Sequence, residues 1–256
     1  MRKKKSLGQH FLSDRGAAQR IANSLNWGNK PLQLLEIGPG NGALTEHLLK
    51  HDNLDYCGIE LDRRLVPILT ERYGNQNIRF VEADVLQIDL ATIFNGEFSI
   101  VGNFPYNISS QIVFRVLEYR NNVAELVGMF QKEVAERICA GPGTKKYGII
   151  SVLTQVWYDA ELLLLLPPEA FRPPPAVHSG VIRLQRNGRT EMPCDEKRFK
   201  TVVKLAFNTR RKMLRNSLKS LIQDEQILER PIFTKRPEQL DIQEFFEITQ
   251  IVEDAG

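Results

Sequence analysis

Residues Leu34–Gly42 (LLEIGPGNG) give the clearest indication of the fold class of this chain. A short apolar run, typical of a buried strand, leads directly into a turn with glycine at positions 38, 40 and 42. Glycine adopts backbone conformations closed to other residues and lets the main chain approach a ligand. The spacing differs from the dinucleotide pattern G-x-G-x-x-G, because the last glycine comes one residue early. Taken alone, the stretch fits a plain strand–helix turn as well as a nucleotide-like cofactor site.

Outward from this stretch, apolar runs alternate with helical patterns through the first two thirds of the chain. Such alternation is typical of a parallel sheet covered by helices on both faces. We therefore expect an α/β fold with a mostly parallel sheet. The expected strands lie near 32–37, 55–60, 78–82, 98–102 and 125–130, and the expected helices near 43–51, 62–73, 109–119 and 131–140.

The pattern changes in the last third of the chain. After a helix expected near 147–157, two β-like runs at 160–166 and 179–185 flank three consecutive prolines, which exclude helix. We expect these runs to form an antiparallel edge of the sheet. A polar break at Asn187–Arg189 predicts two domains, 1–187 and 188–256, the second with helices at 196–207, 210–222 and 237–252.

Positive charge is concentrated near the two ends of the chain. The net charge is only +3, yet residues 197–219 contain nine Lys or Arg and no Asp or Glu, and residues 2–5 add four more. This is the footprint of a polyanion binder, although most charge runs are solvated helix faces. We expect a nucleic acid partner.

Composition disfavours several other classes of protein. No apolar run approaches the ~20 residues of a membrane span, and no apolar segment follows the basic N-terminus as in a secretory signal. Cys57, Cys139 and Cys194 are far apart, and no residues show metal-ligand spacing. We therefore expect free thiols, a cytoplasmic location, no metal and no membrane contact.

Acidic residues end the next two expected strands. Glu60 follows Gly42 by 18 residues and can accept hydrogen bonds from ribose hydroxyls, while Asp84 can accept one from an adenine amino group. Because ligands of open parallel sheets bind at the carboxyl ends of strands, these groups would meet in one crevice. The alternative is that both residues cap the helices that follow them. Asp62 is a better cap for 63–73 than Glu60, which leaves Glu60 for a ligand.

The segment Asn103–Tyr106 (NFPY) follows the fourth strand. The Asn103 side-chain oxygen and the Phe104 carbonyl can accept both hydrogens of a planar amino group, and Pro105 keeps Phe104 extended. Tyr106 offers a ring for base stacking, worth ~1–3 kcal/mol. A rigid loop before a helix is the structural alternative. Behind a cofactor crevice, the segment predicts methyl transfer to an exocyclic nitrogen of a base.

At this point the sequence closely resembles the small-subunit ribosomal RNA adenine dimethyltransferases, the KsgA (RsmA) family. The matching motifs run through nearly the whole chain. They are Gly8–Leu12, Glu36–Gly40, Ile59–Asp62, Asn103–Asn107, Gln131–Val134, Phe171–Val177 and Phe207–Leu218.

The resemblance implies a Rossmann-like class I methyltransferase sheet with a small α-helical, RNA-binding C-terminal domain. It implies S-adenosylmethionine as methyl donor. The implied substrate is a pair of adjacent adenosines near the 3′ end of 16S rRNA, each dimethylated at N6, within an immature 30S subunit. No obligate protein partner is implied.

The resemblance also assigns roles to residues. His10, Leu12, Gly38 and Gly40 should border the cofactor, Glu60 should hold its ribose and Asp84 its adenine. Asn103 should lie between cofactor and target base, with Tyr106 and Phe171 on opposite faces of that base. Arg210, Arg211 and Lys212 should contact RNA. Two residues depart from the common pattern: His10 stands where many members have Asn, and Phe104 where Leu is common. His178 is expected to be buried.

Two rival functions remain at this stage. The same segment also suits methylation of cytosine N4, DNA adenine or a glutamine amide, and the full-length resemblance argues against these. The closest alternative is methylation of an adenine of large-subunit rRNA, against which the motif Arg210–Leu218 argues. The second rival is an RNA-binding assembly factor without catalysis, which should show decay at Glu60, Asp84 or Asn103. None is evident.

Overall fold

The computed structural model describes residues 10–28 and 32–255. The predictions for residues 2–5, and for Gly8 and Gln9 of the first motif, lie outside the described residues. Within the described ranges, no helix is both long enough and apolar enough to cross a membrane.

The chain divides into two compact units. Unit 1 comprises residues 1–135 and 159–186, and unit 2 comprises 136–158 and 187–256. The division drawn from sequence placed residues 136–158 with the α/β domain, whereas they group with the C-terminal helices here. One reason is local: the Gln155 side chain binds the carbonyls of Ile138 and Ala140, which holds the segment together as one body.

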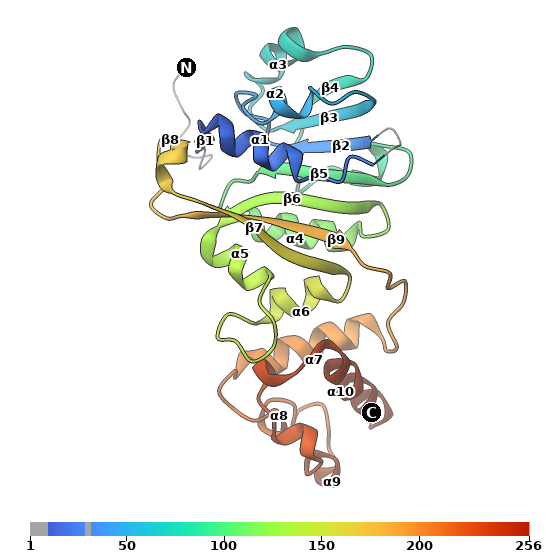
Figure 1. The fold of residues 1–256 in the computed structure, drawn as a ribbon. Helices are drawn as coiled ribbons and strands as arrows, with labels where there is room; N and C mark the ends of the chain where they lie inside the picture. Colours follow the sequence, from blue (N-terminus) through green and yellow to red (C-terminus); the bar gives the residue numbers. More distant parts are fainter. Residues whose placement is uncertain (1–9, 29–31, 256) are drawn as a thin grey trace. The chain divides into compact units, whose positions relative to one another are not determined.

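Unit 1 contains a seven-stranded sheet in the order β4-β3-β2-β5-β6-β9-β7 (Figure 1). Strands β2 to β6 pair in parallel, and β9 pairs antiparallel with β6, so the expected mostly parallel sheet with an antiparallel edge is confirmed. The strands are β2 (Leu32–Ile37), β3 (Leu54–Glu60), β4 (Ile78–Glu82), β5 (Phe98–Asn103), β6 (Val123–Gln131), β7 (Tyr158–Leu166) and β9 (Ser179–Arg186).

Helices cover the sheet because its central strands are apolar on both faces. Helix α1 (Arg15–Asn23) buries Ala17, Ala18, Ile21 and Ala22 in one core with residues of β2, β5, β6 and β9. Helix α4 (Ser109–Glu118) lies across the opposite face (Figure 1) and buries Ile112, Val113 and Val116. This double burial matches the near-continuous apolar character of the strands.

The other helices of this region are shorter than the patterns predicted. They are α2 (Thr45–Leu48), α3 (Val66–Tyr73) and α5 (Lys132–Ile138). Before α3, Asp62 organises a turn, since its carbonyl accepts from the Leu65 amide and its carboxylate from the Arg64 amide. The helix therefore starts at Val66, with Pro67 in its first turn.

A two-stranded sheet was not predicted. Strand β1 (Phe11–Leu12) pairs antiparallel with β8 (Phe171–Arg172), with Phe11 opposite Arg172 and Leu12 opposite Phe171. Segments from near the two ends of unit 1 thus lie side by side (Figure 1). A strand of two residues has no periodicity, so no sequence pattern marks it.

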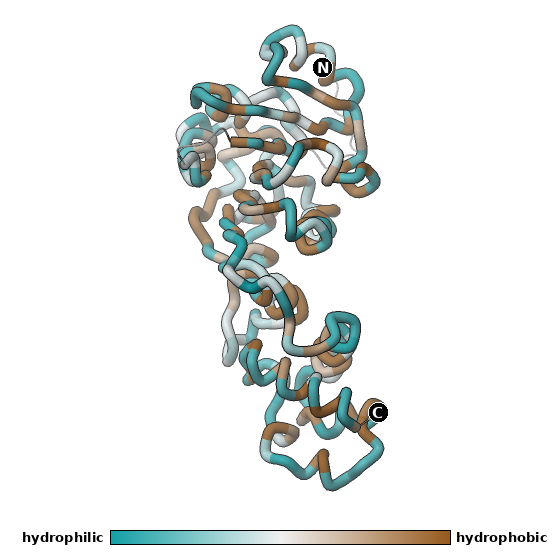
Figure 2. The backbone as a smooth tube through the Cα atoms, turned by 90° about the vertical axis from the view of Figure 1, so that its right-hand side faces the viewer, coloured by the Kyte–Doolittle hydropathy of each residue, from teal (hydrophilic) through white to brown (hydrophobic). Residues whose placement is uncertain are grey.

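Unit 2 is helical around an aromatic core. Its helices are α6 (Ile149–Gln155), α7 (Glu196–Asn208), α8 (Leu214–Ser217), α9 (Glu225–Leu228) and α10 (Ile242–Asp254). Phe199 of α7 packs against Phe245 and Phe246 of α10. Hydrophobic and hydrophilic segments alternate along these helices, as expected for one buried face (Figure 2).

The predicted helix over 210–222 is wrong, because only Leu214–Ser217 is helical. The Leu214 amide donates to the Lys235 carbonyl, 2.9 Å away, instead of continuing an i to i−4 ladder. A tertiary hydrogen bond thus interrupts the helix at its start.

Candidate active site

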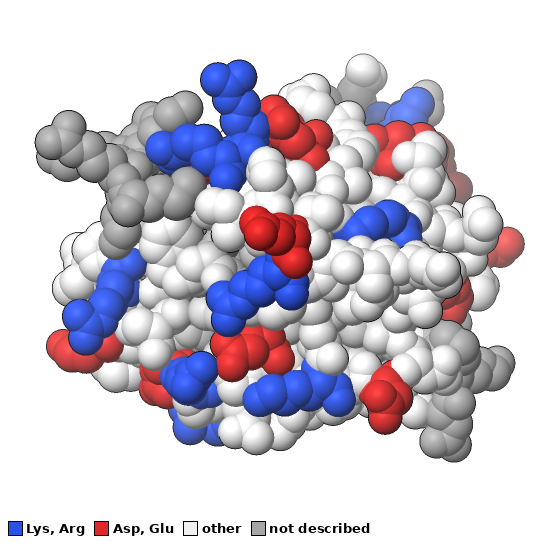
Figure 3. All heavy atoms as spheres, turned by 90° about the horizontal axis from the view of Figure 1, so that it is seen from above, with Lys and Arg blue, Asp and Glu red and all other residues white. Residues whose placement is uncertain are grey.

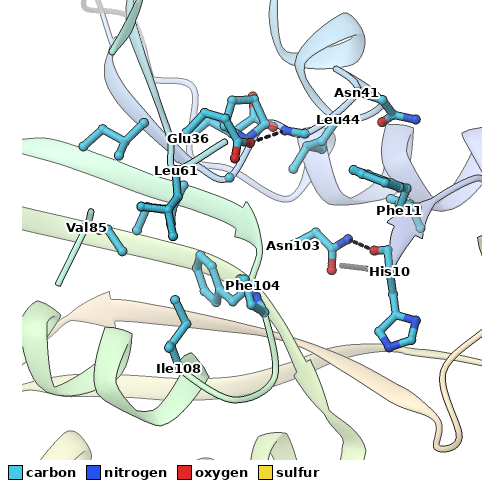
Figure 4. Close-up of a pocket in the computed structure, with 18 of the residues that line it drawn as sticks. His10, Phe11, Glu36, Asn41, Leu44, Leu61, Val85, Asn103, Phe104 and Ile108 are labelled. Atoms are coloured by element: carbon cyan, nitrogen blue, oxygen red, sulfur yellow. Dashed lines mark hydrogen bonds between the residues drawn. The ribbon is translucent and has the colours of Figure 1, made fainter. Parts of the chain in front are cut away.

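A cavity opens at the carboxyl ends of β2, β3, β4 and β5 (Figure 4). Parallel strands bring these ends to one edge of the sheet, where ligands of open α/β folds bind. The cavity collects every residue predicted to border a cofactor. These are His10, Leu12, Gly38, Gly40, Glu60, Asp84 and Asn103.

The glycine turn requires glycine at all three positions. Gly38, Gly40 and Gly42 have φ values of 69°, 60° and 81°, which side-chain-bearing residues rarely adopt. At Gly40 an added Cβ would also lie 3.0 Å from the ring of Phe11. The turn therefore presents bare main chain to the cavity, with Phe11 packed against it.

Glu60 connects the glycine turn to the end of β3. Its Oε2 accepts from the Gly40 amide and its Oε1 from the Asp62 amide, both at 2.9 Å. The residue is 4% exposed, and burial raises the pKa of Glu60. A carboxylate has about four acceptor sites, so Glu60 braces the turn and can still accept from a ligand.

Asp84 lies just beyond β4 and also lines the cavity. Its Oδ1 accepts from the Leu86 amide at 2.9 Å, which shapes the following turn. Within residues 10–28 and 32–255, no group bonds to Oδ2. One oxygen is therefore structural and the other remains available to a donor.

Glu36 is a cavity residue that the sequence analysis did not propose as a site residue. Its Oε2 accepts from the hydroxyls of Thr45, at 2.7 Å, and Tyr56, at 2.5 Å. Burial raises the pKa of Glu36 to about 7, despite the opposing effect of these bonds. Its signal in the sequence is a lone carboxylate in the apolar strand that precedes the glycine turn.

Asn103 ends β5 with its side chain held in one orientation. Its amide nitrogen donates to the main-chain carbonyl of His10 at 2.7 Å (Figure 4). In the described part of the chain, the side-chain oxygen has no hydrogen-bond partner. The tie to His10 therefore turns a free acceptor toward the cavity.

Phe104 lines the cavity and has a buried ring. The ring is 1% exposed and meets Phe130 edge-on, with centroids 5.3 Å apart. A Cβ at Gly102 or Gly128 would approach this ring within 2.6 or 2.2 Å. The two paired glycines make room for a phenyl group, which anchors the main chain of the Asn103–Tyr106 segment.

Tyr106 and Phe171 occupy different environments. The Tyr106 hydroxyl bonds to the hydroxyl of buried Ser179 at 2.7 Å, and its ring stacks with His10. Phe171, on β8, is 2% exposed and belongs to a core cluster that also includes Leu12 of β1. The structure thus presents the Tyr106 ring near the cavity and keeps the Phe171 ring inside the fold.

The predicted RNA-contacting residues lie in unit 2. Arg211 and Lys212 are exposed, and no ion pair joins either of them to another described residue. Arg210 is partly engaged, since it donates to the Thr144 carbonyl and lies 4.0 Å from Glu238. By contrast, one face of unit 1 carries both charge signs interspersed (Figure 3).

The last two expectations concern the burial of His178 and the presence of metal ligands. His178 was expected to be buried, and this is wrong: the residue is exposed because it lies in the proline-rich loop before β9. No group of three or more His, Cys, Asp or Glu among the described residues could hold a metal ion.

Comparison with known proteins identifies the family. Residues 1–253 match the family described as "Ribosomal RNA adenine dimethylase". Two proteins named "Ribosomal RNA small subunit methyltransferase A" are similar over 97% of this chain. The one from Parabacteroides distasonis is 51% identical, with 93% of its length covered, and the one from Cytophaga hutchinsonii is 49% identical, with 96% covered.

Solved structures show the same fold. A dimethyladenosine transferase from Plasmodium falciparum has a TM-score of 0.83 at 23% identity, covering 96% of this chain and 98% of the other. The 23S rRNA methyltransferase ErmE has a TM-score of 0.71 at 28% identity, covering 94% and 99%. With the sheet order, the cavity and a match over almost its full length, this chain belongs to the ribosomal RNA adenine dimethylase family.

Proposed function

We propose that this protein transfers methyl groups from S-adenosylmethionine to N6 of two adjacent adenosines near the 3′ end of 16S rRNA, during assembly of the small subunit in the cytoplasm. The observation that carries the proposal is Asn103, whose amide nitrogen is tied to His10 and whose oxygen is free at the cavity. An amide oxygen held in this way is an acceptor for the hydrogen of a target amino group.

The cavity residues fit the methyl donor. Main chain at Gly38 and Gly40 permits close approach, Glu60 keeps lone pairs for ribose hydroxyls, and Asp84 keeps one oxygen for an adenine amino group. When bound, S-adenosylmethionine supplies an electrophilic methyl group on a positively charged sulfur. Glu36 and Glu60 contribute buried carboxyl groups to the lining of the cavity that would hold it.

The protein's contribution to the reaction is orientation of the amine. The lone pair of an adenine amino group is delocalised into the ring, which makes the nitrogen a poor nucleophile. Acceptance of its two hydrogens by the Asn103 oxygen and the Phe104 carbonyl favours a pyramidal nitrogen with an exposed lone pair. Burial raises the pKa of Tyr106, so this phenol stays protonated and acts through its ring rather than as a base.

We assign RNA binding to the basic segment of unit 2, residues 197–219. Exposed cations that lack ion-pair partners are free to replace counterions on phosphates. Arg211 and Lys212 meet this condition more fully than Arg210. We place the substrate in an immature 30S subunit and invoke no obligate protein partner.

Mass mapping of 16S rRNA tests the proposal. A strain that lacks this protein should lose two dimethyladenosines, and the wild-type gene should restore them while the Asn103→Ala gene should not. Mapping 23S rRNA in the same samples addresses the alternative that the similarity to ErmE raises. Unchanged 16S adenosines, or loss of a modification in 23S rRNA alone, would refute the proposed substrate.

A further inference from the structure

His10 makes three contacts that join separate parts of unit 1. Its carbonyl accepts from Asn103, its Nδ1 lies 2.9 Å from the Pro173 carbonyl, and its ring stacks on Tyr106 with centroids 5.7 Å apart at 30°. A carbonyl only accepts, so Nδ1 carries the proton in this bond. The main chain and the imidazole of His10 therefore serve different partners.

The imidazole points away from the cofactor end of the cavity. In Figure 4 the carbonyl of His10 faces Asn103, whereas the ring extends to the side opposite Asn41 and Leu44. Tyr106, the ring's stacking partner, does not line the cavity. The imidazole thus occupies the side of Asn103 on which a target base would have to lie.

Tyr106 is the fixed member of the stacked pair. Its hydroxyl bonds to Ser179, which is fully buried on β9. The His10 side chain is only partly buried, and its ring is held by one hydrogen bond to the proline-rich loop. If one partner of the stack gives way, it is His10.

We propose that the His10 imidazole occupies the place of the target adenine. It covers the Tyr106 ring in the enzyme without RNA and leaves when the base enters. This inference rests on the proposed function and adds a step to it. An adenine extracted from RNA loses its stacking partners, and it would regain one by exchange for the imidazole. The resting stack keeps Tyr106 covered and makes base entry a competition.

Steady-state kinetics with 30S subunits from a strain that lacks this protein, whose 16S rRNA is unmethylated at the target adenosines, tests the exchange. His10→Ala removes the competing ring, so the KM for RNA should fall about two- to tenfold, the factor expected for one aromatic pair. His10→Asn keeps a polar side chain without an aromatic ring and should show the same fall. His51→Ala is the matched control, because His51 stacks on Trp27 outside the cavity, and it should leave the KM unchanged.

A double-mutant cycle separates competition from a general structural role. In a Tyr106→Ala background there is no ring to compete for, so His10→Ala should no longer change the KM. A 2-aminopurine at the target position gives a second readout: its quenching on binding should be stronger with His10→Ala than with wild type. An unchanged or higher KM for both His10 variants, or an equal effect in both backgrounds, would overturn the exchange. Wild-type enzyme that fails to methylate these subunits would instead refute the proposed function.

Discussion

The cavity of unit 1 and the basic segment of unit 2 handle charge in opposite ways. Glu36 and Glu60 are almost fully buried, and each accepts two hydrogen bonds from the protein. Arg211 and Lys212 are exposed and make no ion pair within the described residues. The first arrangement fixes the position of each polar atom, whereas the second leaves its charges accessible to solvent.

This difference matches the two tasks proposed for these regions, catalysis in the cavity and RNA binding by the basic segment. A group that acts on one atom of a substrate must be held before the substrate arrives, because reorganisation adds to the barrier. A phosphate contact needs only accessible charge, since its free energy comes largely from released counterions. Substitutions in the two regions should therefore differ in size and in salt dependence.

Asn103→Ala should have the largest effect. Removal of one oriented acceptor for the target amine should lower the methylation rate by ~10²–10³. The affinity for S-adenosylmethionine should fall much less, and calorimetry on the same preparation checks this. A rate within a fewfold of wild type in folded protein would break the assignment of Asn103.

Glu36→Gln should change the pH dependence of stability. Burial raises the pKa of Glu36 to about 7 in the folded protein, whereas the unfolded chain releases this proton near the ordinary pKa of 4.5. The folded state thus binds more protons between these values, and the free energy of unfolding falls as pH rises, by at most about 3 kcal/mol.

Urea unfolding at pH 5 and pH 8 measures this difference. Glutamine keeps an oxygen for Thr45 and Tyr56 but has no proton to lose, so the variant should lose less stability over this range than wild type. Burial also raises the pKa of Glu60 and Glu125, and their contributions remain in both proteins. Equal pH slopes would show that Glu36 does not titrate in this window.

Glu60→Ala should weaken binding of S-adenosylmethionine by the equivalent of ~1.5–3 kcal/mol, the value of a hydrogen bond to a charged group. Part of this loss would come from the Gly40 amide, which Glu60 holds. Glu60→Gln retains an acceptor and should fall between the alanine variant and wild type in calorimetry. Unchanged affinity in both variants would make Glu60 a purely structural brace.

Arg211→Gln with Lys212→Gln should produce a smaller effect per residue than the cavity substitutions. Loss of two phosphate contacts should reduce the slope of log affinity against log salt by about 1 to 2. Affinity for S-adenosylmethionine should not change. Lys50→Gln with Arg63→Gln removes the same charge from exposed positions of unit 1 and is the control.

Arg210→Gln sharpens the same comparison. Arg210 already binds Thr144 and lies near Glu238, so it should contribute less to the salt slope than either neighbour. If the double variant binds RNA with an unaltered slope, the basic segment is a solvated face and the contrast between the two regions fails.

Much of the sheet could be predicted because its signals are local. A short apolar run such as Phe98–Asn103 is typical of a buried strand, and it can be recognised from neighbouring residues alone. The helix expected at 210–222 failed for the opposite reason. Its pattern is helical, but the Lys235 carbonyl competes for the Leu214 amide, and a contact across 21 residues leaves no periodicity to detect.

The candidate site divides in the same way. Sequence alone determined which residues end the strands, since Glu60, Asp84 and Asn103 follow apolar runs whose carboxyl ends must meet at one edge of a parallel sheet. Only the tertiary structure decided the state of each group. The β1–β8 pairing brings the His10 carbonyl to Asn103, and burial raises the pKa of Glu36. The sequence specifies the type of each side chain, but the orientation and desolvation of that side chain depend on neighbours that are distant in sequence.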